Sequence, residues 1–215
     1  MADLKNIYMK DTSDVEANYR LAKKYVDRWE SAKACTYFNN ILRLDPQDQS
    51  GYGEESRLQT AIYKARYQKE KDIKPLIAFL DESHNKDFLD EGYYNLRVYY
   101  RNIHDTTGYY ESLEKALTIF NDDASLMNEY AWAIFKNKTE NRYQRGIELA
   151  QKAVQLKPES SGIWDTLAWL YYVTGEKEKA VSAMEKAVAD NPDYNERLKE
   201  LQKAIAGTAI NMDNI

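Results

Sequence analysis

The sequence contains little cysteine, glycine or proline. Among its 215 residues there are one cysteine, eight glycines and four prolines. A single cysteine excludes an intrachain disulfide, and the scarcity of glycine and proline leaves little material for long flexible linkers. Cys35 falls in a segment with helical spacing, next to Ala34, so we expect it to be a small buried apolar residue rather than a reactive thiol.

Basic blocks and long apolar runs are also missing. The net charge is −5, which argues against a nucleic-acid or an anionic-membrane partner. No run approaches the ~20 apolar residues of a membrane span, and the first residues lack the apolar core of a signal peptide. The sequence leaves the compartment open between the cytoplasm and, if the chain is a fragment of a longer protein, the periplasm.

Motifs that carry chemistry are absent as well. His84 and His104 have no second histidine or cysteine at ligand spacing, which argues against a zinc site. There is no phosphate-binding glycine loop, no dinucleotide fingerprint and no nucleophile elbow. Paired carboxylates such as Glu54 and Glu55 are typical of solvated helix faces or helix caps. We therefore expect no catalytic activity and no cofactor.

The chain does contain one very regular stretch, from Ser161 to Tyr194, in which two apolar stripes flank a glycine and end at a proline. Its fixed positions are Trp164, Leu167, Ala168, Tyr171, Gly175, Ala180, Met184, Ala187 and Pro192. The first stripe has the i, i+3, i+4, i+7 spacing of one helix face, and the glycine suits a helix end because it tolerates a positive φ. Small alanines in the second stripe let two helices approach closely. The stretch therefore predicts a helical hairpin.

These residues resemble the repeat of tetratricopeptide-repeat (TPR) proteins, a hairpin of about 34 residues. One hairpin cannot bury its apolar face alone, so the resemblance implies neighbouring repeats. It implies an all-α fold, a right-handed superhelical solenoid of about five antiparallel helix pairs with a C-terminal capping helix. It also implies a non-catalytic scaffold that mediates protein–protein interaction through a concave groove.

The rest of the chain divides into similar units. We expect an N-terminal lead-in over residues 1–11, a single solenoid over 12–206 and a flexible tail over 207–215. The units are expected at 12–46, 50–85, 90–123, 124–159 and 161–194, with the cap at 195–206. The 50–85 unit carries few signature residues, and its assignment follows from helix count and position alone.

Two residues depart from the repeat pattern. Trp29 stands where Gly175 stands in the regular unit, which leaves the geometry of the first inter-helix turn open. Arg97 stands where Ala168 stands. We expect this bulky charged side chain to loosen its hairpin or to turn its head to water along an aliphatic stem.

The groove candidates lie one step off the buried stripe, on the first helix of each pair. They are Tyr19, Lys23, Tyr94, Arg101, Asn128, Trp132, Phe135, Asp165, Trp169 and Tyr172. Aromatic rings with a few polar groups suit an extended or helical peptide. Packing between adjacent hairpins is the alternative role for Trp132 and Trp169. Asn128 and Asp165 are stronger ligand candidates, because polar groups are rarely buried without a partner.

A second resemblance is to the TPR regions that follow a thioredoxin-like domain in some bacterial proteins. It rests on the segments LAKKYVDRW, LMNEYAWAI and WDTLAWLYY. It implies an alternative function, a structural or dimerisation arm of a larger bacterial protein, without redox chemistry because no C-x-x-C motif is present. The expected partner is a protein or peptide, with a homo-oligomer possible and with no nucleic acid and no membrane insertion.

Overall fold

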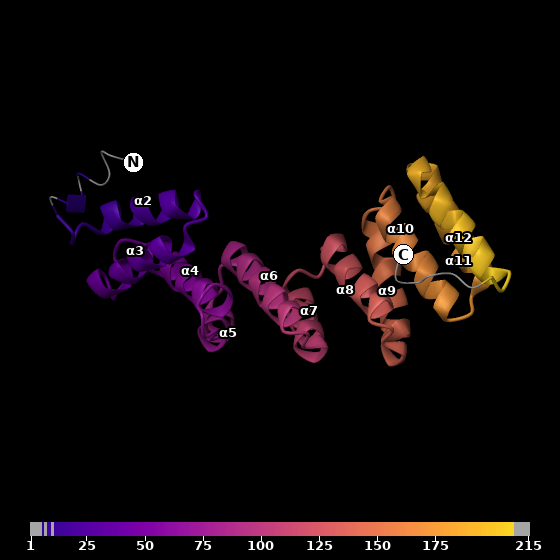
Figure 1. Cartoon of the computed structure of the whole chain (residues 1–215), viewed down its shortest axis with the longest axis horizontal. Coiled ribbons are helices and arrows are strands. Elements are labelled where there is room, and N and C mark those ends of the chain that lie inside the picture. Colours follow the sequence, from indigo (N-terminus) through magenta and orange to yellow (C-terminus); the bar gives the residue numbers. More distant parts are fainter. Residues whose placement is uncertain (1–5, 7, 10, 209–215) are drawn as a thin grey trace. The chain divides into compact units, whose positions relative to one another are not determined.

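The computed structural model describes residues 6, 8, 9 and 11–208, and this part of the chain consists of helices and connecting loops without a strand (Figure 1). Most of the predicted lead-in over 1–11 and of the predicted tail over 207–215 lies outside the described residues. The chain forms two compact units, Met1–Ser112 and Leu113–Ile215, called here the N-terminal unit and the C-terminal unit. The boundary falls within helix α7, Thr106–Ile119.

The N-terminal unit consists of successive helices joined by short loops. They are α2 (Val15–Val26), α3 (Ser31–Leu44), α4 (Gly53–Arg66), α5 (Lys74–Glu82), α6 (Lys86–Asn102) and the first half of α7. Helix α2 packs on α3, α3 packs on α4, and α4 packs on both α5 and α6. From α2 to α6, successive helices thus contact one another, and α4 also contacts the next hairpin through α6, which is the arrangement of stacked helix pairs.

The C-terminal unit repeats this arrangement. After the second half of α7 it contains α8 (Ala124–Lys136), the 3₁₀ turn η1 (Glu140–Arg142), α9 (Tyr143–Leu156), α10 (Ser161–Val173), α11 (Lys177–Asp190), η2 (Pro192–Tyr194) and α12 (Asn195–Ile205). Helices α8 and α9 form one pair and α10 and α11 form the next, while α12 packs on α11 and α10. The extra residues of the loop between α8 and α9 form η1.

Short polar side chains determine where several helices begin. The Asp14 carboxylate accepts from the Ala17 backbone N–H at 2.9 Å, and the Asp123 carboxylate accepts from the Ser125 N–H at 2.8 Å. The side-chain oxygen of Asn85 accepts from two N–H groups at the start of α6. These contacts satisfy donors that have no partner within the helix. Because Asn85 is the cap, α6 begins at Lys86, four residues before the expected unit at 90–123.

The regular stretch folds as its pattern predicts. Ala168, Ala180, Met184 and Ala187 are fully buried, on the facing sides of α10 and α11. The described residues form five successive helix pairs followed by α12. The all-α helix-pair fold is therefore confirmed. No helix in the described part of the chain is long and apolar enough to cross a membrane.

Two single-residue expectations have different outcomes. Cys35 is buried, as expected, and burial raises the pKa of its thiol. The expectation that Arg97 turns its head to water is wrong, because the side chain is 7% exposed. Its guanidinium lies 6.0 Å from the centre of the Tyr94 ring. A cation over an aromatic face is stabilised electrostatically, so α6 accommodates the arginine by pairing it with an aromatic side chain.

Candidate functional site

The predicted aromatic residues of the C-terminal unit form a continuous row on α8 and α10. The Trp132 and Phe135 rings are 5.2 Å apart, Phe135 and Trp169 are 6.0 Å apart, and Trp169 and Tyr172 are 5.8 Å apart, centre to centre. Trp169 is fully buried and Phe135 is buried, whereas Trp132 and Tyr172 are half-buried. The row therefore joins two helix pairs and leaves little of its centre open to a ligand.

Asp165 is also enclosed. Its side chain accepts a hydrogen bond from Trp169 Nε1 at 3.0 Å and pairs with Arg197 Nε of α12 at 2.7 Å. Burial raises the pKa of this carboxyl, while the bonds from Arg197 and Trp169 act in the opposite direction. The Arg197 guanidinium also lies 5.8 Å from the centre of the Trp132 ring. Helix α12 therefore covers this end of the aromatic row.

Asn128 is a predicted groove residue on α8 whose side-chain oxygen lacks a hydrogen bond. The side chain is half-buried, and its Oδ1 atom is buried without a hydrogen-bond partner. A buried acceptor without a donor costs about 1–3 kcal/mol. Asn128 thus has spare hydrogen-bonding capacity.

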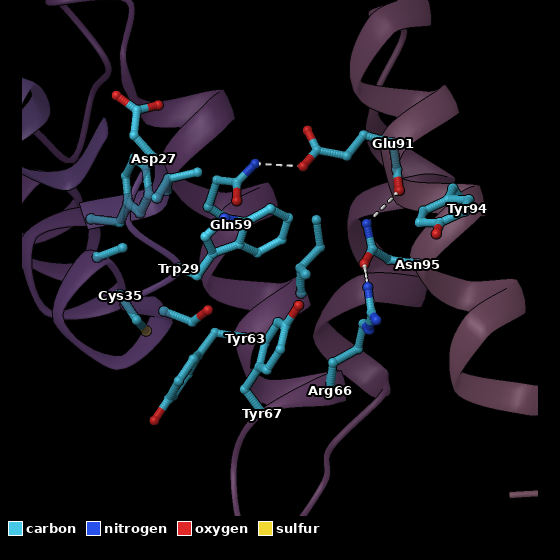
Figure 2. A pocket seen from close by; sticks show the side chains of 15 residues that line it. Asp27, Trp29, Cys35, Gln59, Tyr63, Arg66, Tyr67, Glu91, Tyr94 and Asn95 are labelled. Atoms are coloured by element: carbon cyan, nitrogen blue, oxygen red, sulfur yellow. Dashed lines mark hydrogen bonds between the residues drawn. The ribbon is translucent and has the colours of Figure 1, made fainter. Parts of the chain in front are cut away.

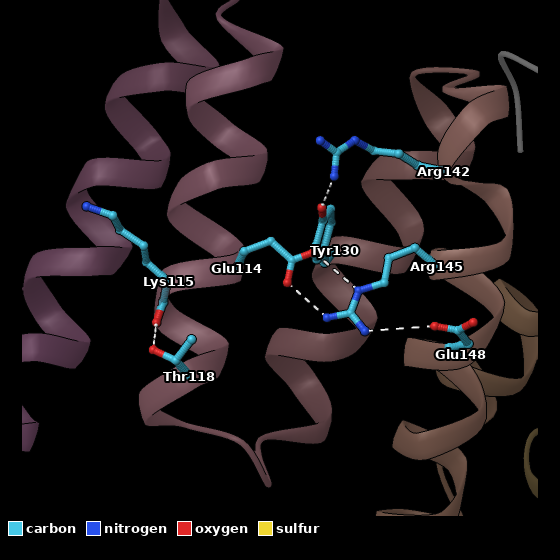
Figure 3. Close-up of polar contacts among 7 residues, drawn as sticks. All are labelled: Glu114, Lys115, Thr118, Tyr130, Arg142, Arg145 and Glu148. Carbon is cyan, nitrogen blue, oxygen red and sulfur yellow. Dashed lines mark hydrogen bonds and ion pairs between the residues drawn. The ribbon is translucent and has the colours of Figure 1, made fainter.

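A second polar cluster of the C-terminal unit has a structural role (Figure 3). Arg145 donates two hydrogen bonds to the Glu114 carboxylate, at 3.2 and 2.9 Å, and Arg142 donates to the Tyr130 hydroxyl at 2.8 Å. Burial alone would raise the pKa of Glu114, and the Arg145 bonds outweigh it and hold that pKa below its ordinary value. Burial and the Glu114 charge raise the pKa of Tyr130 to about 12. The cluster therefore ties α7, α8 and α9 together.

Two predicted groove residues of the N-terminal unit are held by the neighbouring helix. The Tyr19 hydroxyl donates to one oxygen of Glu55 at 2.6 Å, and Lys23 Nζ lies 2.6 Å from the other. Burial and the Glu55 contact raise the pKa of Tyr19 to about 12. Both side chains thus link α2 to α4. Arg101 is exposed on α6, and Tyr94 is exposed at an open pocket.

That pocket is an open cavity of the N-terminal unit with a volume of about 500 Å³ (Figure 2). Helices α2, α3, α4 and α6 and the turn after α2 contribute its walls. Its lining residues are Val26, Asp27, Trp29, Ser31, Ala34, Cys35, Phe38, Gln59, Ile62, Tyr63, Arg66, Tyr67, Glu91, Tyr94 and Asn95. All of them lie within the N-terminal unit, so the site is complete in that unit alone.

Among the described residues, most of the large exposed apolar side chains line this pocket. Val26 is 38% exposed, Trp29 89%, Tyr67 49% and Tyr94 52%. Among the described residues the other large exposed apolar side chains are Met9, Ile103 and Leu156, and none of them lines the pocket. Isolated exposed apolar residues are ordinary, whereas a cluster at a concave surface marks an interaction site.

The opposite wall of the pocket is polar and held in place by hydrogen bonds between α4 and α6. Gln59 Nε2 donates to Glu91 Oε1 at 2.8 Å, and an Arg66 nitrogen donates to Asn95 Oδ1 at 2.6 Å. Asn95 in turn donates to the Glu91 backbone carbonyl at 2.8 Å. These contacts fix the wall without neutralising Arg66, which has no carboxylate within ion-pair distance among the described residues.

Trp29 occupies a strained backbone position at the rim. Its φ is 59°, in the left-handed region, which costs a residue with a Cβ about 1–2 kcal/mol. The same residue is the most exposed large apolar side chain of the described chain. The positive φ belongs to the inter-helix turn, since His104 and Lys138 adopt it after α6 and α8, whereas the exposed indole is specific to this turn.

Sequence reasoning placed Tyr94 at a groove but missed most of the pocket. Gln59, Tyr63 and Arg66 lie on α4, in the 50–85 unit, where the repeat signature is too weak to assign residues to a face. Trp29 carried a signal, because a tryptophan replaced the glycine expected at its turn. That departure was an indication of the site.

The fold defines the chain as a helical-repeat protein, and comparison with known proteins gives the class of repeat. Residues 139–205 match the tetratricopeptide repeat family, and this range includes the regular stretch from Ser161 to Tyr194. The resemblance to TPR proteins is therefore confirmed. The family match supports it for residues 139–205, and the succession of helices supports it for the rest of the described chain. No curated protein sequence matches the chain.

Several solved structures share the fold. YrrB, described as a TPR protein with an unusual peptide-binding site, has a TM-score of 0.65 and 13% identity, over 94% of this chain and 97% of that one. The MamA protein has a TM-score of 0.59 and 18% identity, over 98% and 100%. A double mutant of MamA from RS-1 has a TM-score of 0.64 and 16% identity, over 85% and 97%. At these identities the likeness concerns the fold.

Proposed function

We propose that this chain is a non-catalytic scaffold that binds a protein partner through the pocket of the N-terminal unit. The TPR fold is typical of protein–protein interaction scaffolds. The observation that carries the proposal is the clustering of Val26, Trp29, Tyr67 and Tyr94, all exposed, around one open cavity. Aromatic anchors supply most of the energy of many protein interfaces. YrrB, with the same fold, is described as having a peptide-binding site, which supports binding of a protein segment.

The pocket has the features of a site for an apolar anchor within a polar frame. Trp29 and Val26 offer apolar surface, and Arg66 offers a donor on the other side. A partner that covers Trp29 would bury most of the exposed surface of its indole ring. A fully buried aromatic residue removes about 150–250 Å² from water, which favours binding. The hydrogen-bonded α4–α6 wall is already ordered, which lowers the entropic cost of binding.

The aromatic row of the C-terminal unit supports this role less well. Phe135, Asp165 and Trp169 are buried, and Arg197 already occupies the carboxylate. A ligand would have to displace α12 to reach them. The predicted groove residues of α8 and α10 are therefore assigned to packing between helix pairs in our proposal, with Asn128 and Tyr172 as peripheral contacts.

Site-directed photo-cross-linking in cells of the source organism tests the proposal. A benzophenone amino acid replaces Tyr94, which is exposed at the pocket, and in a control it replaces Leu156, which is exposed on α9. We expect a discrete cross-linked product at position 94 that disappears when Trp29→Ala is added. Equal or absent cross-linking at the two positions would contradict the proposal.

A further inference from the structure

We infer that the partner of the N-terminal pocket is a second copy of this chain, so that Trp29 of each copy enters the pocket of the other. The inference rests on the proposed function and specifies its partner. Three observations support it: a projecting side chain beside a cavity, charges of both signs on one surface, and the area available for burial.

The pocket surface carries both a projection and a recess. Trp29 is 89% exposed and belongs to the lining of a cavity of about 500 Å³. Two-fold contacts use the same patch on both copies, so each patch must complement itself. A tryptophan next to a cavity satisfies this condition, because the projection of one copy meets the recess of the other in both directions.

The charges of the pocket are also self-complementary. Asp27 and Arg66 lie on opposite sides of the pocket in Figure 2. Arg66 lacks a carboxylate partner, and Asp27 has a cation no nearer than Lys24 Nζ at 3.9 Å on its own exposed helix turn. A two-fold contact places Asp27 of one copy near Arg66 of the other, twice. A surface built for a peptide of one charge would carry the opposite charge alone, so the mixture of signs favours a second copy.

The area available matches a weak dimer. The four exposed apolar side chains offer on the order of 400–500 Å² per copy, scaled from about 150–250 Å² for each fully buried aromatic residue. With the polar rim, two copies approach the ~1,000 Å² at which specific interfaces begin. We therefore expect a reversible dimer in the micromolar range. The net charge of −5 opposes association, so the dimer strengthens with moderate salt until the Asp27–Arg66 pairs are screened.

Charge reversal at the two positions tests the contact directly. Sedimentation velocity is measured for the full chain across the micromolar range, for Asp27→Arg, for Arg66→Asp and for their equimolar mixture. In each single variant, positions 27 and 66 carry the same sign, so we expect dimerisation to weaken by about tenfold or more. In the mixture the two pairings regain opposite signs, and we expect a dimer that contains one chain of each kind. Glu16→Arg, which changes net charge equally on α2 outside the pocket, is the control.

The outcomes distinguish this inference from the proposed function. A wild-type dimer, weakened singles and a restored mixture support the inference. A monomeric wild type, or a mixture no stronger than the singles, overturns it. If a monomeric chain still cross-links at position 94 to a different protein, the proposed function stands and the self-association fails. If neither cross-linking nor association occurs, both fail. Thermal unfolding of each variant verifies that loss of the dimer does not arise from loss of fold.

Discussion

The two units use their aromatic side chains in different ways. In the C-terminal unit Trp169 is fully buried, its indole N–H bonds to Asp165, and α12 closes over it through Arg197. In the N-terminal unit Trp29, Tyr67 and Tyr94 line an open cavity, and among the described residues each stays about half or more exposed. The same repeat architecture therefore carries one aromatic cluster enclosed by the chain's own helices and one that lines an open cavity.

The inter-helix turns show the same difference at the level of the backbone. Gly175 after α10 has φ 84°, and Trp29 after α2 has φ 59°. The turns make equivalent hydrogen bonds: Glu176 N donates to Tyr171 O at 2.8 Å, and Glu30 N donates to Tyr25 O at 2.9 Å. Glycine adopts this conformation without strain. The tryptophan turn keeps the same geometry at a cost in stability, as do the turns after α6 and α8, where His104 and Lys138 have φ 57° and 52°.

The largest effect that we predict concerns the closed surface of the C-terminal unit. Arg197→Ala leaves the buried Asp165 carboxylate without its cation, and we expect the unfolding free energy to fall by about 2–4 kcal/mol. Urea unfolding measures the change. The control is Lys199→Ala on the same helix, whose pair with Glu196 is exposed and should change stability little. Equal effects of the two variants would show that α12 does not depend on Asp165.

The next prediction concerns the tight packing of the last helix pair. Ala187 is fully buried on α11, so Ala187→Trp should overpack the contact with α10 and lower stability by about 1–3 kcal/mol or more. The matched control is Ala189→Trp. Ala189 lies two residues later on the exposed face of α11, so its replacement should be nearly neutral. Unfolding midpoints in urea compare them. Unchanged stability of the Ala187→Trp chain would mean that the buried stripe is placed wrongly.

The regular turn should respond to a small change in backbone preference. A Cβ added at Gly175 meets no atom within 4 Å, so Gly175→Ala tests the positive φ alone, and we expect a loss of about 1 kcal/mol. Gly162→Ala, inside α10, should be neutral or stabilising because alanine favours a helix and the new Cβ lies 3.6 Å from the Tyr194 hydroxyl, an ordinary contact. In thermal melts the midpoint of Gly175→Ala should therefore fall, while that of Gly162→Ala stays unchanged or rises; an equal fall in both would contradict the assignment of strain.

The smallest effect is a pH dependence of the closed surface. Burial raises the pKa of Asp165 above its ordinary value of 3.8. Between the ordinary pKa and the raised pKa of the folded state, the folded chain binds the proton more tightly than the unfolded chain, so the unfolding free energy falls as the pH rises through this window. The stability of wild type relative to Asp165→Asn should therefore decline as the pH is raised from about 4. A rise instead would show that the Arg197 charge outweighs burial.

The sequence predicts the fold well where the pattern is local. The stripe of Leu167, Ala168 and Tyr171 and the glycine at 175 define one hairpin, and this hairpin requires neighbours to bury its faces. The exposure of a groove residue is harder to predict, because it depends on side chains from distant helices. The sequence pattern predicts that Asp165 contacts a ligand. In the structure Arg197, 32 residues later, donates to the Asp165 carboxylate in place of a ligand. That the groove residues named from the sequence contact a ligand stays a prediction.

The pocket could not be derived from periodicity. Its α4 wall comes from the most irregular unit, and the hydrogen bonds from Gln59 and Arg66 to α6 join residues about thirty positions apart. Spacing rules describe one helix and its partner, whereas this wall depends on two hairpins. The tryptophan at position 29 was the feature of the sequence that marked the region, since a turn that favours glycine carries there the largest side chain.

The comparison of the turns leads to the most direct test of the open surface. His104 lies in the turn after α6 and has the same left-handed conformation as Trp29, with φ 57°, and it does not line the pocket. We predict that Trp29→Gly and His104→Gly each raise the unfolding free energy by about 0.5–1 kcal/mol, as measured by urea unfolding. In the same samples, sedimentation should show self-association lost in Trp29→Gly and retained in His104→Gly. A Trp29→Gly chain that is less stable, or that still associates like wild type, would contradict the account.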